Sequence, residues 1–138
     1  MHNTATTVLV VDDDRIVRDF AKDVLERHGY LVQSAGDGES ALTFLTSLPV
    51  DIVLIDIMMP RKEGLETIIE LRQRYPKLTV FAMSSSGSRR GHDFLATAAK
   101  FGAHGVIQKP FTPEQLLKLL HSSPNLRDEH APLSSLRA

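Results

Sequence analysis

The chain has 138 residues, of which 42% are hydrophobic and 24% are charged, and these proportions are typical of one soluble globular domain. Sixteen basic residues against 17 acidic ones give a formal net charge of -1, which argues against direct binding to nucleic acid. The absence of cysteine excludes disulfides, thiolate metal sites and cysteine nucleophiles. Apolar runs are far shorter than the about 20 residues that cross a bilayer, and the first residues lack a secretory pattern, so we expect a cytoplasmic protein without a membrane segment.

The predicted elements alternate between short apolar strands and amphipathic helices. Val8–Val11 is continuously apolar, as are strands that are buried on both faces of a parallel sheet. Apolar residues spaced three and four apart then predict a first helix, with Asp14 as its N-cap and Gly29 as its stop. Further along the chain we expect strands at residues 30–32, 52–55, 80–83 and 105–107, and helices near residues 39–48, 65–75, 93–101 and from 113 onward.

The alternation of strands with helices predicts an α/β fold built from βαβ units with right-handed crossovers. We expect a five-stranded parallel sheet, doubly wound, in the flavodoxin-like order 2-1-3-4-5. The last helix has the clearest start, because Thr112, Pro113 and Gln115 match a capping box with proline at the first helical position. We place one domain at residues 8–121, an N-terminal extension at 1–7 and a flexible, Ser- and Pro-rich tail at 122–138.

Acidic residues follow two strands that this order makes neighbours. Asp12, Asp13 and Asp14 come after the first strand, and Asp56 comes after the third. In such sheets ligands bind outside the carboxyl ends of the strands where the strand order reverses. Carboxylates that meet there raise one another's pKa unless a cation neutralises them, and their hard oxygens suit Mg²⁺. A solvated, helix-capping turn would account for the three consecutive acids taken alone, but it leaves Asp56 unexplained.

Two further polar residues end the fourth and fifth strands. Ser84 and Lys109 are expected at the same edge of the sheet as the acids. An ammonium and a hydroxyl beside a carboxylate and a metal ion can hold a tetrahedral anion while the carboxylate attacks it. Together these residues indicate phosphoryl transfer to a carboxylate, although a serine-rich loop or a surface lysine alone would indicate nothing of the kind.

These segments resemble the receiver domains of two-component response regulators over about residues 8–120. The resemblance lies in residues 8–14, in residues 53–60 with Gly64 four residues beyond Pro60, in Ser84, and in the pair Lys109 and Pro110. It implies that Asp56 is the phosphorylated residue and that Mg²⁺ is the cofactor. The Mg²⁺ ligands implied are Asp13, Asp56 and the backbone carbonyl of Met58, with Asp12 acting mainly through metal-bound water.

The resemblance also assigns roles to the remaining site residues. Ser84 would bind the phosphoryl group, Lys109 would pair with a phosphoryl oxygen, and the Lys109–Pro110 peptide bond would be cis, which only X-Pro bonds adopt at low cost. The chain departs from the family motif at Gly105 and Val106, where an acidic residue and an aromatic one are expected. Valine has no ring to reorient, so a signal would travel through loop and helix displacement; simple packing of Val106 in an edge strand is an equal alternative.

A histidine kinase or a histidine phosphotransfer protein is the implied phosphoryl donor, and Arg15 and Arg18 on the first helix are candidates for donor docking. A stand-alone, chemotaxis-regulator-like receiver would signal to a downstream protein through the face of the fourth helix, fifth strand and fifth helix. We expect a signalling phosphoacceptor with slow self-dephosphorylation rather than an enzyme, and no contact with nucleic acid or membrane.

Two other functions compete with this interpretation. A haloacid-dehalogenase-type phosphatase would use Asp12 as its nucleophile, because an apolar strand followed by Asp-x-Asp also fits that family. The chain is short for such an enzyme, and the only acids beyond Glu114 are Asp128 and Glu129, in the tail. A non-phosphorylated interaction module is the other alternative, against which the intact set of acidic residues argues.

Overall fold

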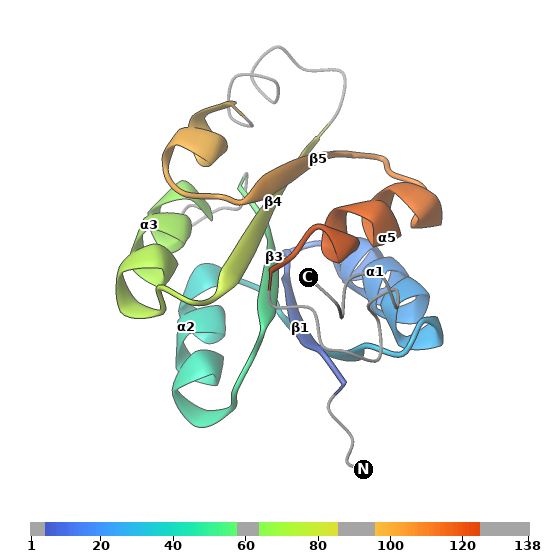
Figure 1. Ribbon diagram of the computed structural model, residues 1–138, viewed down its shortest axis with the longest axis horizontal. Helices are drawn as coiled ribbons and strands as arrows, with labels where there is room; N and C mark the ends of the chain where they lie inside the picture. Colours follow the sequence, from blue (N-terminus) through green and yellow to red (C-terminus); the bar gives the residue numbers. More distant parts are fainter. Residues whose placement is uncertain (1–4, 58–63, 86–95, 125–138) are drawn as a thin grey trace, which may run out of the picture.

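The computed structural model describes residues 5–57, 64–85 and 96–124 and contains one parallel sheet of five strands in the order β2-β1-β3-β4-β5. This order confirms the predicted flavodoxin-like arrangement, in which β1 and β3 lie side by side at the centre (Figure 1). The strands are β1 Thr7–Val11, β2 Leu31–Ala35, β3 Ile52–Asp56, β4 Thr79–Ser85 and β5 Gly105–Lys109.

Helices cover both faces of the sheet, as the doubly wound prediction requires. α1 and α5 lie on one face, and α2 and α3 lie on the other (Figure 1). Residues 96–100 are also helical, at the end of the predicted segment 93–101. None of the helices within the described residues has the length and apolarity that crossing a membrane requires. The helix bounds are α1 Arg15–Arg27, α2 Gly38–Ser47, α3 Gly64–Arg74 and α5 Pro113–His121.

The central strands separate two hydrophobic cores. Because successive side chains of a strand point to opposite faces, Val8 and Val10 pack with Leu25 of α1 on one face. Leu9 and Val11 pack with residues of α2 and α3 on the other face. All residues of 8–11 and 52–55 are fully buried, which is why both runs are continuously apolar in the sequence. The two cores hold the carboxyl ends of β1 and β3 at fixed positions.

The helix caps form as the sequence predicts, whereas one edge strand is longer than expected. Asp14 accepts a hydrogen bond from the Ile16 N–H at 2.9 Å, and Thr112 forms both bonds of its capping box. Gly29 adopts a φ of 92° after α1, in the left-handed region that glycine enters without strain. β2 continues to Ala35. An edge strand tolerates polar, exposed residues, and because such residues carry no apolar signal the sequence predicts a shorter strand.

Packing also continues beyond residue 121, where the domain was predicted to end. Ser122 is the C-cap of α5. Ser123 is buried, and its hydroxyl donates a hydrogen bond to the Thr79 hydroxyl at 3.0 Å. This contact joins the end of α5 to the first residue of β4, which hydrophobic patterning cannot predict.

His104 binds the backbone of β4 just before β5 begins. Its backbone N–H donates to the Val80 carbonyl at 2.7 Å, and the ring nitrogen Nδ1 accepts from the Val80 N–H at 3.0 Å. Partial burial and the nearby guanidinium of Arg72 lower the pKa of His104. A backbone N–H can donate only to an unprotonated ring nitrogen, so the fold requires neutral His104.

This histidine should make stability depend on pH. The pKa of His104 is lower in the folded protein than its ordinary value of about 6.5, so neutral His104 stabilises the fold above pH 6.5. That stabilisation is lost as the pH falls through the lower pKa of the folded state. We expect the free energy of unfolding, measured by urea denaturation, to fall less between pH 7.5 and pH 5 in His104→Gln than in wild type. His121→Gln removes an imidazole from the exposed end of α5 and should behave like wild type. Parallel pH curves for all three proteins would contradict the prediction.

Candidate functional site

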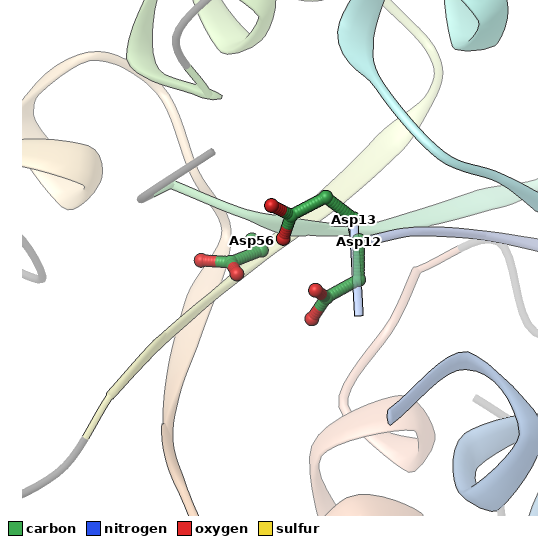
Figure 2. Close-up of side chains that lie close together, drawn as sticks. All are labelled: Asp12, Asp13 and Asp56. Atoms are coloured by element: carbon green, nitrogen blue, oxygen red, sulfur yellow. The ribbon is translucent and has the colours of Figure 1, made fainter. Parts of the chain in front are cut away.

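Three carboxylates meet at the carboxyl edge of the sheet. Asp12 and Asp13 follow β1, and Asp56 is the last residue of β3. One oxygen from each of these side chains lies within 4.8 Å of the others (Figure 2). They converge because the parallel pairing places Val11 beside Ile55, so the residues that follow, Asp12 and Asp56, lie at the same edge of the sheet. The predicted cluster is therefore present, and Asp14 caps α1 instead of joining it.

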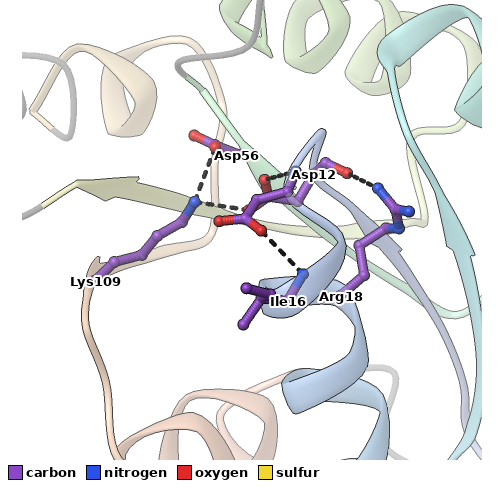
Figure 3. A network of polar contacts seen from close by, with 6 residues as sticks. Asp12, Ile16, Arg18, Asp56 and Lys109 are labelled. Atoms are coloured by element: carbon purple, nitrogen blue, oxygen red, sulfur yellow. Dashed lines mark hydrogen bonds and ion pairs between the residues drawn. The ribbon is translucent and has the colours of Figure 1, made fainter.

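Lys109 joins two of these carboxylates from the end of β5. Its Nζ donates to Asp12 Oδ2 at 2.7 Å and to Asp56 Oδ2 at 2.9 Å (Figure 3). Asp12 is fully buried and Asp56 is 4% exposed, whereas Asp13 is exposed to solvent. The site is negative, because the three carboxylates and the single ammonium of Lys109 sum to a charge of -2.

Burial and mutual repulsion perturb the ionisation of this site. Burial raises the pKa of Asp12 to about 6, with the charge of Asp56 acting in the same direction. The bonds from Lys109 and from the Asp14 N–H oppose that increase. Burial acts to lower the pKa of Lys109, but its bonds to Asp12 and Asp56 outweigh this effect and raise it. Lys109 is therefore a charged ammonium, and a further cation would stabilise the ionised form of the carboxylates around it.

The backbone at the end of β1 is held from several directions. The Asp12 N–H donates to the Ala35 carbonyl of β2 at 3.1 Å. Oδ1 of Asp12 accepts from the Asp14 N–H at 2.9 Å. The Asp12 carbonyl accepts from Nη1 of Arg18 at 2.8 Å (Figure 3). Arg18 is a candidate for donor docking from its place on the first helix, but its bond to the site backbone has no signature in the sequence.

The backbone at the end of β3 is crowded by the start of α3. A Cβ atom built on Gly64 would lie 2.4 Å from the Asp56 carbonyl oxygen and 2.4 Å from the Ile57 Cα. Only glycine allows this approach without displacing the backbone. The Ile57 N–H also donates to the Met83 carbonyl of β4 at 3.0 Å. The main chain around Asp56 is thus fixed by β4 on one side and by α3 beneath it.

The remaining predicted site residues are only partly described. Ser84 is fully buried near the carboxyl end of β4, one residue beyond Met83, which pairs with Asp56. The strand runs one residue further than predicted, to Ser85. The Lys109–Pro110 peptide bond is cis, as the resemblance implied. Met58, the predicted carbonyl ligand, lies outside the described residues.

The oxygen atoms of the three carboxylates suit a hard divalent cation. Carboxylate oxygens from Asp12, Asp13 and Asp56 are the ligands that Mg²⁺ accepts, and Mg²⁺ usually retains several waters beside one or two carboxylates. The charge of -2 and the exposure of Asp13 to solvent fit such an ion. When bound, the ion would supply positive charge for a negatively charged ligand.

Replacement of Lys109 should affect stability and metal affinity in opposite directions. Lys109→Met leaves two buried carboxylates without their ammonium, which should reduce the free energy of unfolding of the metal-free protein by about 3–5 kcal/mol. The same change removes a competing cation, so Mg²⁺ should bind more tightly and restore stability. Urea unfolding with and without Mg²⁺ measures both effects. Lys100→Met, at an exposed position, is the control, and an equal loss in both variants would contradict the prediction.

The family described as Response regulator receiver domain matches residues 8–121 of the chain. The chain belongs to this family. Apart from Thr7, the match covers all five strands, and it includes the site residues Asp12, Asp13, Asp56, Ser84 and Lys109. The chain is therefore a receiver domain of the kind used in two-component, phosphorylation-based signalling. Membership in this family decides against the phosphatase alternative.

Two curated relatives are regulators that are longer than this chain. The transcriptional regulatory protein CpxR of Klebsiella pneumoniae is 36% identical over 110 residues, which cover 80% of this chain and 45% of the relative. The response regulator MprA of Mycolicibacterium vanbaalenii is 37% identical over 110 residues, which cover 80% of this chain and 46% of the relative. The chain thus spans about half the length of these curated relatives.

Solved structures of receivers have the same fold. The receiver domain of NtrX from Brucella abortus is 29% identical with a TM-score of 0.79, over 84% of this chain and 96% of that one. The chemotaxis protein CheY4 of Vibrio cholerae is 30% identical with a TM-score of 0.78, over 87% of this chain and 99% of that one. These likenesses agree with the strand order and the receiver assignment.

Proposed function

We propose that the receiver accepts a phosphoryl group on Asp56 from a phosphohistidine of a histidine kinase or a histidine phosphotransfer protein. A carboxylate oxygen of Asp56 attacks phosphorus, the P–N bond breaks, and its electron pair returns to the imidazole nitrogen of the donor. The observation that carries the proposal is the bond from Lys109 to both Asp56 and Asp12, because it places a cation beside the attacking oxygen.

The other site residues have distinct proposed roles. Asp13, Asp56 and the carbonyl of Met58 would hold Mg²⁺, with Asp12 acting mainly through metal-bound water, and the ion would supply positive charge for the phosphoryl oxygens. Lys109 pairs with a phosphoryl oxygen once one is available, and the hydroxyl of Ser84 donates a hydrogen bond to the phosphoryl group. The net charge of -2 before metal binding supports a cation requirement, since it would otherwise repel a phosphorylated donor.

Donor docking is proposed at the start of α1, beside the acidic site. Ile16 is 78% exposed and Phe20 is 39% exposed. Both line a groove with Lys109 and Phe111, so an apolar surface lies directly next to the reacting groups. Arg15 is also exposed there, paired with Asp19. The apolar residues would bind the donor, and Arg15 would add charge at the rim.

Output is proposed through protein contacts on β5 and α5. Val106, in place of the family's aromatic residue, lies on the edge strand β5 and is 37% exposed. It lines a groove together with Gln115 and Lys118 of α5. Arg89 and Arg90, where the sequence also pointed to an output surface, lie outside the described residues.

Intact mass measurement tests the proposed reaction. After incubation with a small-molecule phosphodonor, wild type should gain the mass of one phosphoryl group in the presence of Mg²⁺ and none in the presence of a chelator. We also propose slow self-dephosphorylation, so the adduct should persist after the donor and Mg²⁺ are removed and decay slowly when Mg²⁺ returns. Failure to form an adduct with either a small donor or a phosphorylated histidine phosphotransfer protein would favour a non-phosphorylated interaction module.

A further inference from the structure

Arg18 reaches from the second turn of α1 to the end of β1. Its side chain is half-buried, and Nη1 donates a hydrogen bond to the Asp12 carbonyl oxygen at 2.8 Å (Figure 3). The same nitrogen lies 3.7 Å from the position that a Cβ atom of Gly36 would occupy. The guanidinium therefore sits where β1 and β2 both end, beside the loop that carries Asp13.

This hydrogen bond acts on the peptide unit between Asp12 and Asp13. A peptide unit is planar, so the direction of the Asp12 carbonyl also determines the direction in which the Asp13 backbone begins. Asp12 has other restraints, from Ala35, Asp14 and Lys109. Within the described part of the chain, no hydrogen bond or ion pair holds the Asp13 carboxylate, which is exposed. The placement of that carboxylate depends on its backbone.

We propose that Arg18 is a positioning residue for the cation site, because it orients the peptide unit from which the Asp13 carboxylate projects. This inference rests on the proposed function, in which Asp13 is a Mg²⁺ ligand. The effect is geometric and opposes the effect of charge. A guanidinium near a cation site repels the cation, so its removal should strengthen Mg²⁺ binding if charge alone mattered.

Mg²⁺ titration of the unphosphorylated full chain distinguishes the two effects by sign. We expect Arg18→Gln to weaken Mg²⁺ binding about tenfold, as the loss of one charged hydrogen bond can, when the affinity is followed by calorimetry or by amide NMR shifts. Arg15→Gln removes the same charge from the exposed side of the same helix and should leave the affinity unchanged or slightly higher. Arg18→Lys, which keeps a donor on a shorter side chain, should bind Mg²⁺ with intermediate affinity.

A metal-free measurement separates positioning from a general loss of structure. In the absence of Mg²⁺, Arg18→Gln should shift the Asp13 amide resonance while amides of β3 and β4 keep their wild-type positions. Equal Mg²⁺ affinities for Arg18→Gln and Arg15→Gln, or an unmoved Asp13 amide, would overturn the inference and leave the proposed function intact. If Arg18→Gln does not fold, wild-type affinity in Arg18→Lys would overturn it. A wild type that does not bind Mg²⁺ would overturn the proposed function and this inference together.

Discussion

Asp56→Asn is expected to abolish the phosphoryl adduct completely, whichever donor is used. Asparagine has nearly the same shape as aspartate but has no carboxylate oxygen to attack phosphorus. It also relieves repulsion between two buried carboxylates that share one ammonium. The variant should therefore fold, and its melting temperature should equal or exceed that of wild type. The measurement is intact mass after incubation with a small phosphodonor and Mg²⁺, beside a melting curve.

Asp12→Asn is the matched comparison, because Asp12 is also a buried carboxylate bonded to Lys109. If Asp56 is the nucleophile, Asp12→Asn should still form the adduct, at a lower rate or at a higher Mg²⁺ concentration. An adduct that survives in Asp56→Asn and disappears in Asp12→Asn would mean that Asp12 is the nucleophile, as in the phosphatase alternative.

Gly64→Ala should displace the backbone that carries Asp56. The added Cβ atom would lie 2.4 Å from the Asp56 carbonyl oxygen and from the Ile57 Cα, and neither backbone atom can move without shifting β3 or α3. We expect the free energy of unfolding to fall by about 2 kcal/mol or more, which is in the upper part of the range for overpacked sites. Because the backbone of Asp56 must shift, the rate of adduct formation should also fall, by about tenfold or more.

Gly36→Ala provides the matched glycine control. A Cβ atom there would meet only Nη1 of Arg18, at an ordinary contact distance of 3.7 Å, so stability should be unchanged or slightly raised. Urea unfolding and time-resolved intact mass give both quantities for each variant. Wild-type stability and rate in Gly64→Ala would show that α3 can move away from β3 without cost.

Most of the architecture could be predicted from local patterns. The continuous apolar runs 8–11 and 52–55 follow from burial of β1 and β3 on both faces. Asp14, Gly29 and Thr112 mark helix ends by backbone chemistry that involves only near neighbours in the chain. Predictions were weakest at β2, because the exposed polar residues of an edge strand carry no hydrophobic signal.

The sequence by itself determined the strand order and the meeting of Asp12, Asp13, Asp56 and Lys109. Polar residues that end parallel strands gather at one edge of the sheet whatever the details of packing. Only the tertiary structure decided four other contacts: Arg18 on the Asp12 carbonyl, Gly64 against the Asp56 backbone, His104 on the Val80 backbone, and the Ser123 hydroxyl on the Thr79 hydroxyl. Such contacts depend on interatomic distances set by how helices pack on the sheet, and the residue types along the chain do not encode these distances locally.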